Sequence, residues 1–368
     1  MISNVICNSA KQGLIPQREY FDKDIANSDN TNGYYIIESN DFVYNPRKSA
    51  DAPYGPISSY QYPEAGIVSP LYLCFRAKRE INPLYFEWYF RSSAWHRYIY
   101  MSGDSGARHD RVSIKDDVFF AMPINVPSAK EQERISLFLD AIERRIETQR
   151  TLVETLKKYK RGVISALLSS KTNPYYSSET WKEVALCDVA SGFEYGMNAA
   201  ATVYDGSHKY IRITDIDDNS HLYSQDVPVS PEGQVDEKYR VRENDILFAR
   251  TGASVGKSYC YQRSDGDLYY AGFLIRIHVN SDVNCGYVFQ NTLTEAYRRW
   301  VLLESARSGQ PGINADQYKQ YRFLLPPLEL QNKISTLATN LDNLICKEEN
   351  LLSQIEQVKI ALLQRLFI

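Results

Sequence analysis

The side chains best suited to chemistry are basic and amide groups on turn-rich segments that also carry tyrosines. Arginine can donate two hydrogen bonds to the edge of a guanine, a side-chain amide can pair with adenine, and lysine mostly contacts phosphate. The candidates are Lys11, Gln12, Gln17, Arg18, Arg47, Lys48, Tyr54, Arg108, His109 and Arg111 near the start, and Lys209, Arg212, Arg250, Lys257, Arg307 and Gln310 later. These groups predict contacts to nucleic acid, and for each of them the alternative is an ordinary solvated surface charge. Glycines at 103, 106, 309 and 312 would let backbone approach phosphate, or simply form turns.

Two stretches only partly resemble catalytic or cofactor motifs. Gly252-Ala-Ser-Val-Gly256-Lys257-Ser258 resembles a phosphate loop, but Thr251 stands where the first glycine belongs. The residues that follow it are typical of a strand, whereas a phosphate loop opens a helix. Asn173-Pro-Tyr-Tyr176 resembles the motif of amino-methyltransferases but lacks one proline, and no glycine-rich cofactor turn accompanies it. The chain is therefore predicted to bind rather than catalyse.

Composition narrows the class of protein. The chain has 42 basic and 45 acidic side chains, so DNA binding must rest on local charge and not on the net charge of −3. Six cysteines lie far apart without a CxxC pair, which argues against disulfides and zinc and fits a reducing cytoplasm. There is no long apolar run and no basic-then-apolar start, so we expect no membrane span and no signal peptide.

One long amphipathic pattern occurs twice, 199 positions apart, at residues 127–168 and 326–367. Its apolar residues recur in heptads, which is typical of coiled-coil helices, and about 40 residues would make a rod of about 60 Å. The predicted seam consists of Ile135, Ile142, Ile146, Leu152, Leu156 and Val163 in the first copy, and Ile334, Leu341, Ile345, Leu351, Ile355 and Leu362 in the second. Because neither rod can bury its stripe alone, we expect the two to pack antiparallel. Gln149 and Glu348 interrupt the seam at equivalent places, either as a polar seam pair or facing solvent.

The regions before each rod also correspond in outline, so the order is domain, rod, domain, rod. We expect an α+β chain with a pseudo-two-fold internal repeat, divided into a first domain (1–126), a first spacer helix (127–170), a linker (171–180), a second domain (181–325) and a second spacer helix (326–368). In the first domain, strands are expected at 34–38, 41–44 and 66–75, a helix at 83–100, a loop at 102–111, and then a strand into Pro123.

This pattern resembles the DNA specificity subunit of type I restriction-modification enzymes. The resemblance rests on two related domains, each followed by a long helix entered through a Pro-x-x-x-x-Gln-x-x-Ile signature. The signature reads Pro127 to Ile135 and, one residue tighter, Pro327 to Ile334. Residues 9–21, 40–45 and 244–257 also look like target-recognition domains of that family. The first domain departs from the pattern, because 64 residues separate Trp181 from Asp245 but only 40 precede Asp41. We therefore expect the first domain to be shortened by roughly two dozen N-terminal residues.

The resemblance implies a function and partners. Each domain would read half of a bipartite site on double-stranded DNA, and the helices would set the gap and dock two copies of an adenine methyltransferase subunit. This chain would be no enzyme and would hold no cofactor or metal; S-adenosylmethionine and ATP would belong to the methyltransferase and restriction subunits. The alternative is a coiled-coil scaffold with two protein-binding domains, which would lack salt-dependent DNA affinity.

Overall fold

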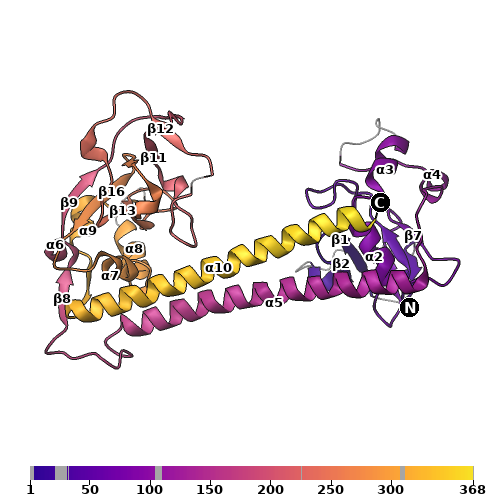
Figure 1. Cartoon of the computed structure of the whole chain (residues 1–368), viewed down its shortest axis with the longest axis horizontal. Helices are drawn as coiled ribbons and strands as arrows, with labels where there is room; N and C mark the ends of the chain where they lie inside the picture. The colour runs from indigo at the N-terminus through magenta and orange to yellow at the C-terminus, as the bar shows by residue number, and fades with distance from the viewer. Residues whose placement is uncertain are drawn as a thin grey trace. The chain divides into compact units, whose positions relative to one another are not determined.

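The computed structural model describes residues 4–20, 31, 33–103, 110–224, 226–306 and 311–367. The chain divides into two compact units, one of residues 1–152 and 348–368, the other of residues 153–347. Each unit consists of one mixed domain and half of each of two long helices (Figure 1). The predicted α+β class is confirmed.

The domain of the first unit contains seven short strands and four short helices among its described residues. They are β1 (Ile6–Ser9), β2 (Gly13–Pro16), α1 (Gln17–Tyr20), β3 (Tyr35–Ile37), β4 (Phe42–Tyr44), β5 (Ile57–Ser59), β6 (Gly66–Val68), β7 (Leu73–Phe75), α2 (Pro83–Arg91), α3 (His96–Ser102) and α4 (Asp116–Phe120). Its central sheet has the order β5-β4-β7, all antiparallel. Phe42 and Tyr44 bury their rings against α2, α3 and α4, which forms the main aromatic core.

The domain of the second unit is larger. Its elements are β8 (Lys182–Ala185), α6 (Leu186–Val189), β9 (Ala190–Tyr195), β10 (Ala201–Val203), β11 (Lys209–Ile211), η1 (Ile213–Asp215), β12 (Val229–Pro231), η2 (Glu237–Tyr239), β13 (Asp245–Ala249), β14 (Ser258–Cys260), η3 (Arg263–Asp265), β15 (Leu268–Tyr270), β16 (Leu274–Val279), α7 (Cys285–Asn291), α8 (Glu295–Ser305), α9 (Ala315–Lys319) and β17 (Arg322–Leu325). The central sheet has the order β14-β13-β16-β9. Strand β13 is buried along its whole length, and after Asp245 its residues are apolar without alternation.

The same turn leads into the central strand in both domains. Asn40 and Asn244 have positive φ values of 69° and 66°, a conformation that asparagine tolerates better than most residues. The following aspartate, Asp41 or Asp245, is buried and accepts a hydrogen bond from the backbone three residues earlier. A side chain on or directly after the neighbouring strand, Arg76 or His278, bonds to the other carboxylate oxygen.

The two domains differ at the start of the second one. There, β8 pairs with β17, and β9 adds a fourth strand beside β16. Among the described residues of the first domain, β7 pairs only with β4, and residues 122–126 have no strand partner. The first domain thus lacks, in its described part, the strands that cover these two edges in the second.

Two sequence expectations for the first domain were wrong in detail. The helix expected at 83–100 is broken into α2 and α3. The break is at Ser92, whose backbone is extended and whose hydroxyl donates a hydrogen bond to Tyr89 O at the end of α2. The strand expected before Pro123 is instead the short helix α4. Asp116 and Asp117 lie in its first turn, where carboxylates favour a helix, and Phe119 enters the aromatic core.

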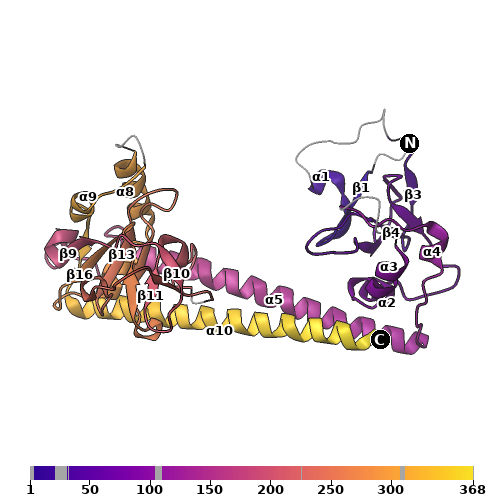
Figure 2. The ribbon, with the colours of Figure 1, turned by 90° about the horizontal axis from the view of Figure 1, so that it is seen from above.

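The two long helices are α5 (Ala129–Leu167) and α10 (Leu328–Leu366), of 39 residues each. In the first unit, Glu143 pairs with Lys359 and Gln149 with Glu348, so the α5 and α10 halves run antiparallel there (Figure 2). In the second unit, Lys160 pairs with Asp342. The two ion pairs join equivalent positions, because Glu143 corresponds to Asp342 and Lys160 to Lys359.

Several buried apolar residues of the two long helices lie four positions after successive positions of the predicted heptads, on the same face of each helix. Leu139, Ile146 and Val153 are buried on α5, and Ala338 and Ile345 on α10. Of the other predicted seam residues, Ile334 is buried and Ile135, Ile142, Leu156, Val163, Leu341, Leu351, Ile355 and Leu362 are half-buried. Leu152 differs from the prediction: it is 42% exposed, whereas Val153 is 3% exposed. Because Leu152 and Val153 are adjacent apolar residues, the sequence allows either of them in the seam, and the packing of the folded helices decides which one is buried.

Candidate nucleic-acid interface

One glutamine fixes each domain to the start of its following helix. The Gln331 Oε1 atom accepts a hydrogen bond from Asn284 N–H at 2.9 Å, and its Nε2 donates to Pro326 O at 2.8 Å. Gln132 bonds in the same way to Asn82 N–H at 3.3 Å and Pro127 O at 2.8 Å. Asn82 is also the N-cap of α2, and Asn284 is the N-cap of α7. Each glutamine therefore connects the long helix that carries it to the loop before that helix and to the N-terminus of a helix in the domain.

This geometry corrects the spacing of the entry signature. The proline that the second glutamine bonds is Pro326, five residues earlier, as Pro127 is for Gln132. The equivalent of Pro127 is therefore Pro326 and not Pro327, and the two signatures have the same spacing. Sequence reasoning identified the glutamines as a signature but gave them no structural role.

A short antiparallel ribbon follows the central strand of the first domain. Residues 46–48 run beside residues 110–112, with Lys48 N–H donating to Asp110 O and Val112 N–H donating to Pro46 O, both at 2.9 Å. Arg47 lies opposite Arg111. The ribbon brings together three of the basic candidates, and Lys11 lies close by, since its Nζ is 3.5 Å from Asp51 in the same loop.

The second domain has the same ribbon after β13. Ile313 N–H donates to Arg250 O, Gly252 N–H donates to Pro311 O, and Thr251 lies opposite Gly312. The guanidinium of Arg250 lies over the ring of Tyr195, 4.8 Å from its centre, and its Nε is buried without a hydrogen-bond partner. Tyr195 was not singled out from sequence, because its contact with Arg250 depends on β9 joining the sheet.

Three other basic candidates use their side chains to hold the second domain together. Arg212 is clamped by Asp215 through two hydrogen bonds at 2.7 and 2.8 Å. Lys257 is largely buried and donates to Ile216 O at 2.9 Å, and it also pairs with Asp218. Lys209 donates to Asp265 O at 2.8 Å. The strand expected after Lys257 is β14, so this stretch does not open a helix as a phosphate loop would.

The remaining candidates are spread over other places. Gln17 and Arg18 belong to α1, and the ring of Tyr54 packs against His96 at 4.8 Å between centres. Arg108, His109, Arg307 and Gln310 lie outside the described residues. The structure therefore gathers Lys11, Lys48 and Arg111 in the first domain and places Arg250 at the equivalent ribbon in the second.

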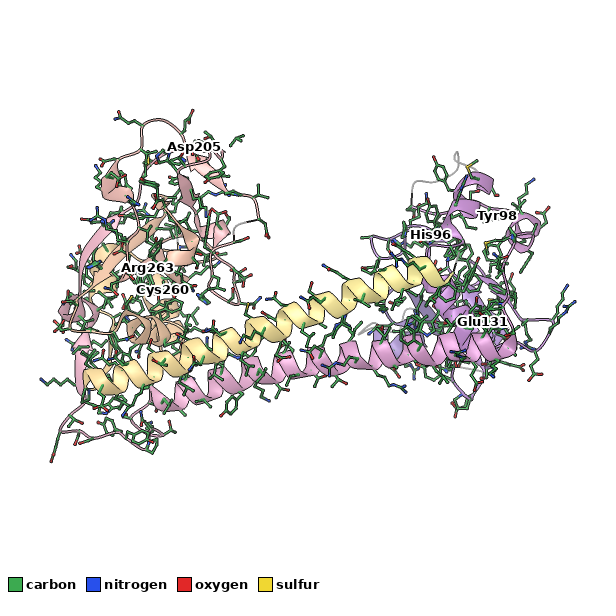
Figure 3. The ribbon with its side chains drawn as sticks, in the orientation of Figure 1. His96, Tyr98, Glu131, Asp205, Cys260 and Arg263 are labelled. Atoms are coloured by element: carbon green, nitrogen blue, oxygen red, sulfur yellow. The ribbon has the colours of Figure 1, made fainter. Side chains whose placement is uncertain are left out.

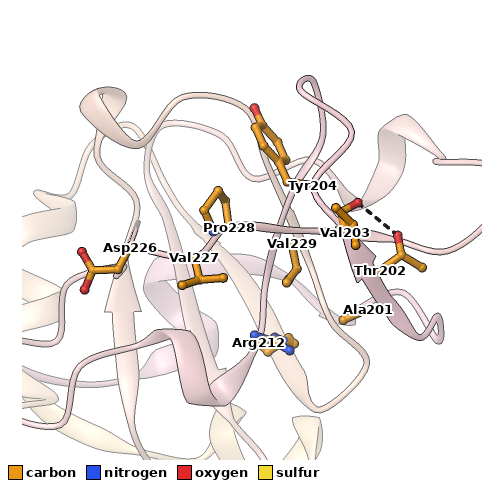
Figure 4. A pocket seen from close by; sticks show the side chains of 9 residues that line it. All are labelled: Ala201, Thr202, Val203, Tyr204, Arg212, Asp226, Val227, Pro228 and Val229. Atoms are coloured by element: carbon orange, nitrogen blue, oxygen red, sulfur yellow. Dashed lines mark hydrogen bonds between the residues drawn. The ribbon is translucent and has the colours of Figure 1, made fainter.

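The second domain also has an open hollow of about 680 Å³ beside the antiparallel pair of strands β10 and β12 (Figure 4). Its lining is mostly apolar and includes Val203, Val227 and Pro228. The one cation in it, Arg212, is already bonded to Asp215. The hollow offers shape and apolar surface, and its other charged lining residue is Asp226.

Within the described residues, no cluster of histidine, cysteine and acidic side chains could hold a metal ion. None of the helices described is long and apolar enough to cross a membrane. The thiols of Cys260 (Figure 3) and Cys285 approach to 3.6 Å, and the hydrogen bond between them, together with burial, raises the pKa of Cys285. At neutral pH Cys285 is therefore a packed, protonated thiol.

His221 makes the second domain sensitive to acid. Burial lowers the pKa of His221 below its usual 6.5, and its Nδ1 bonds to Ser258 O at 2.8 Å. The folded state thus binds fewer protons than the unfolded chain as pH falls below about 6.5, so acid favours unfolding. Because His221 has a φ of 58°, asparagine is the matched replacement.

We expect wild-type stability to fall between pH 6.5 and 5 and His221→Asn to flatten that slope. Urea midpoints measured across this range provide the check. Parallel pH profiles for the two proteins would show that His221 does not control the transition.

Comparison with known proteins shows which families and structures this chain is similar to. Residues 178–357 match the family described as the type I restriction modification DNA specificity domain. The chain is 23% identical over 309 residues to the type I restriction enzyme StySPI specificity subunit of Salmonella potsdam, covering 79% of this chain and 66% of that protein. It is 24% identical over 200 residues to the putative MjaX specificity subunit of Methanocaldococcus jannaschii, covering 51% of this chain and 46% of that protein.

Solved structures share the fold. A chain from a study of complex assembly and conformational transition of the type I R-M system aligns with a TM-score of 0.58 at 16% identity, covering 90% of this chain and 82% of that one. The type I restriction-modification S subunit from M. genitalium aligns with a TM-score of 0.56 at 14% identity, covering 94% and 87%.

Proposed function

We propose that this chain, whose residues 178–357 belong to the type I restriction modification DNA specificity domain family, is the DNA sequence-specificity subunit of a type I restriction-modification complex. The observation that carries the proposal is the duplicated junction at Gln132 and Gln331. It attaches two related domains to the same kind of long helix by the same hydrogen bonds. A protein with two equivalent reading domains suits a DNA site made of two parts.

Each domain would read one half of an asymmetric bipartite site, and α5 and α10 would determine the spacing between the halves. The outward faces of the helices would dock two copies of an adenine methyltransferase subunit. The exposed apolar residues Leu137, Phe138 and Tyr159 on α5 and Val358 and Ile360 on α10 support such contacts. A restriction subunit would join the same assembly.

Under this proposal the chain positions chemistry that its partners perform. S-adenosylmethionine would bind the methyltransferase subunits and ATP the restriction subunit. Few of the basic candidates are left without an acidic partner among the described residues; Lys48, Arg111 and Arg250 are examples. A small number of such groups suits a subunit whose partners also contribute to DNA binding. The complex would act in the cytoplasm.

Exchanging the second domain tests independent reading. Residues 181–325 would be replaced by the corresponding domain of a related specificity subunit, and the chain expressed with its methyltransferase subunit. We expect methylome sequencing to show a change in one half of the methylated sequence and no change in the other. A change in both halves would argue against independent reading, and a complex without salt-dependent DNA affinity would favour a protein-binding scaffold.

A further inference from the structure

We infer that Arg47 and Arg111 form an anion clamp that holds one phosphate of the DNA backbone in the first domain. This inference rests on the proposed DNA-binding function and names residues that would carry it out there. It starts from a feature of the fold that is costly without a ligand: two arginines placed face to face.

The ribbon geometry sets the two side chains beside one another. The hydrogen bonds join Lys48 to Asp110 and Val112 to Pro46, so Arg47 and Arg111 form a non-hydrogen-bonded antiparallel pair. In such a pair both side chains leave the same face, with Cα atoms about 4.5 Å apart. Like charges directly opposite each other destabilise the pairing.

Within the part of the chain that the structure describes, nothing compensates these two charges. Neither guanidinium has a carboxylate at ion-pair distance, and the Nε of Arg111 is buried without a hydrogen-bond partner. Asp110 is the neighbour of Arg111, but successive residues of a strand point to opposite faces. Asp51, in the adjoining loop, is paired with Lys11.

The fold itself does not require arginine at these positions. The equivalent ribbon of the second domain makes the same two backbone bonds with Thr251 opposite Gly312. The repulsion in the first domain is thus particular to its residue types, and an anion between the guanidinium groups would remove it. A phosphate fits this place, because its oxygens accept from two guanidinium forks at once, whereas one guanine edge is filled by one arginine.

The first test uses the full chain and inorganic phosphate, without DNA. At low ionic strength, phosphate should raise the melting temperature of the wild type more than that of Arg111→Gln, and should slow amide exchange at Lys48 and Val112. Without phosphate, Arg111→Gln should melt about 1–3 °C higher than wild type, because the repulsion is gone. Arg79→Gln, an equal loss of charge at an exposed loop position, should respond to phosphate as wild type does.

The second test uses the assembled complex and double-stranded DNA. Arg47→Gln and Arg111→Gln should each weaken binding roughly tenfold on every sequence tested, which is about 1.4 kcal/mol. Each should also lower the salt slope by about 0.9, the value for one phosphate, and the double variant should lower it no further.

Several results would overturn the inference. Equal phosphate responses of Arg111→Gln and wild type would do so, as would an unchanged salt slope. A change in which DNA sequence is bound would show that the arginines read a base instead. If the complex binds no DNA specifically, the proposed function fails, while the phosphate experiment still decides whether the clamp exists.

Discussion

Replacing Gln331 with leucine is expected to destabilise the second unit by about 2–4 kcal/mol. Gln331 is buried, and its amide satisfies both Asn284 N–H and Pro326 O. Leucine fills a similar volume but bonds to neither group, and each unpaired buried polar group costs about 1–3 kcal/mol. Urea denaturation of the full chain, followed by the fluorescence of Trp181 and Trp300, measures the loss.

Two comparisons make this expectation sharper. Gln132→Leu in the first unit should cost less, because its bond to Asn82 N–H is longer, 3.3 Å against 2.9 Å, and Pro127 is less buried than Pro326. Gln357→Leu, on an exposed face of α10, is the matched control and should be nearly neutral. If the Gln331→Leu protein were as stable as this control, Gln331 would not be the residue that joins the domain to the helix.

The long helices could be predicted from sequence because their signal is local. A heptad pattern states which positions share a face, and the seam positions from Ile135 to Val163 followed from it. Its finer choice, Leu152 or Val153, could not be settled, since adjacent apolar residues both fit a stripe of this width. In the structure Val153 is buried and Leu152 is exposed.

The candidate interface was harder to predict for a physical reason. Arg47 and Arg111 were recognised as basic residues on turn-rich segments, but their pairing joins residues 64 positions apart through a register that only tertiary structure fixes. Lys257 and Arg212 looked equally suitable from sequence. Their bonds to Ile216 O and Asp215 depend on loops whose paths the sequence does not reveal.

The polar pair in the helix seam should limit the stability of the first unit. Gln149 is buried, and its Nε2 donates to Glu348 Oε2 at 2.5 Å and to Glu348 O at 3.1 Å. Its Oε1 is buried without a partner. The pair occupies equivalent positions on the two helices, so the seam accepts polar groups there at the expense of apolar contact.

Replacing both residues with leucine is therefore expected to stabilise the helix pair by about 1–3 kcal/mol, because well-packed apolar groups often outdo a buried polar pair. Gln149→Leu alone should gain less, since it leaves the Glu348 carboxylate beside an apolar group. A double-mutant cycle in urea measures the coupling, with Gln354→Leu, an exposed α10 position, as the control.

The same substitution should also reduce the fidelity of helix pairing. In a contact between two chains, α10 against α10 would set Glu348 opposite a second Glu348, which the native Gln149–Glu348 pair avoids. With leucine at both positions this penalty disappears, so the double variant should form more dimers in light scattering at equal concentration. A double variant that is both less stable and strictly monomeric would mean that the seam depends on the polar pair for its packing.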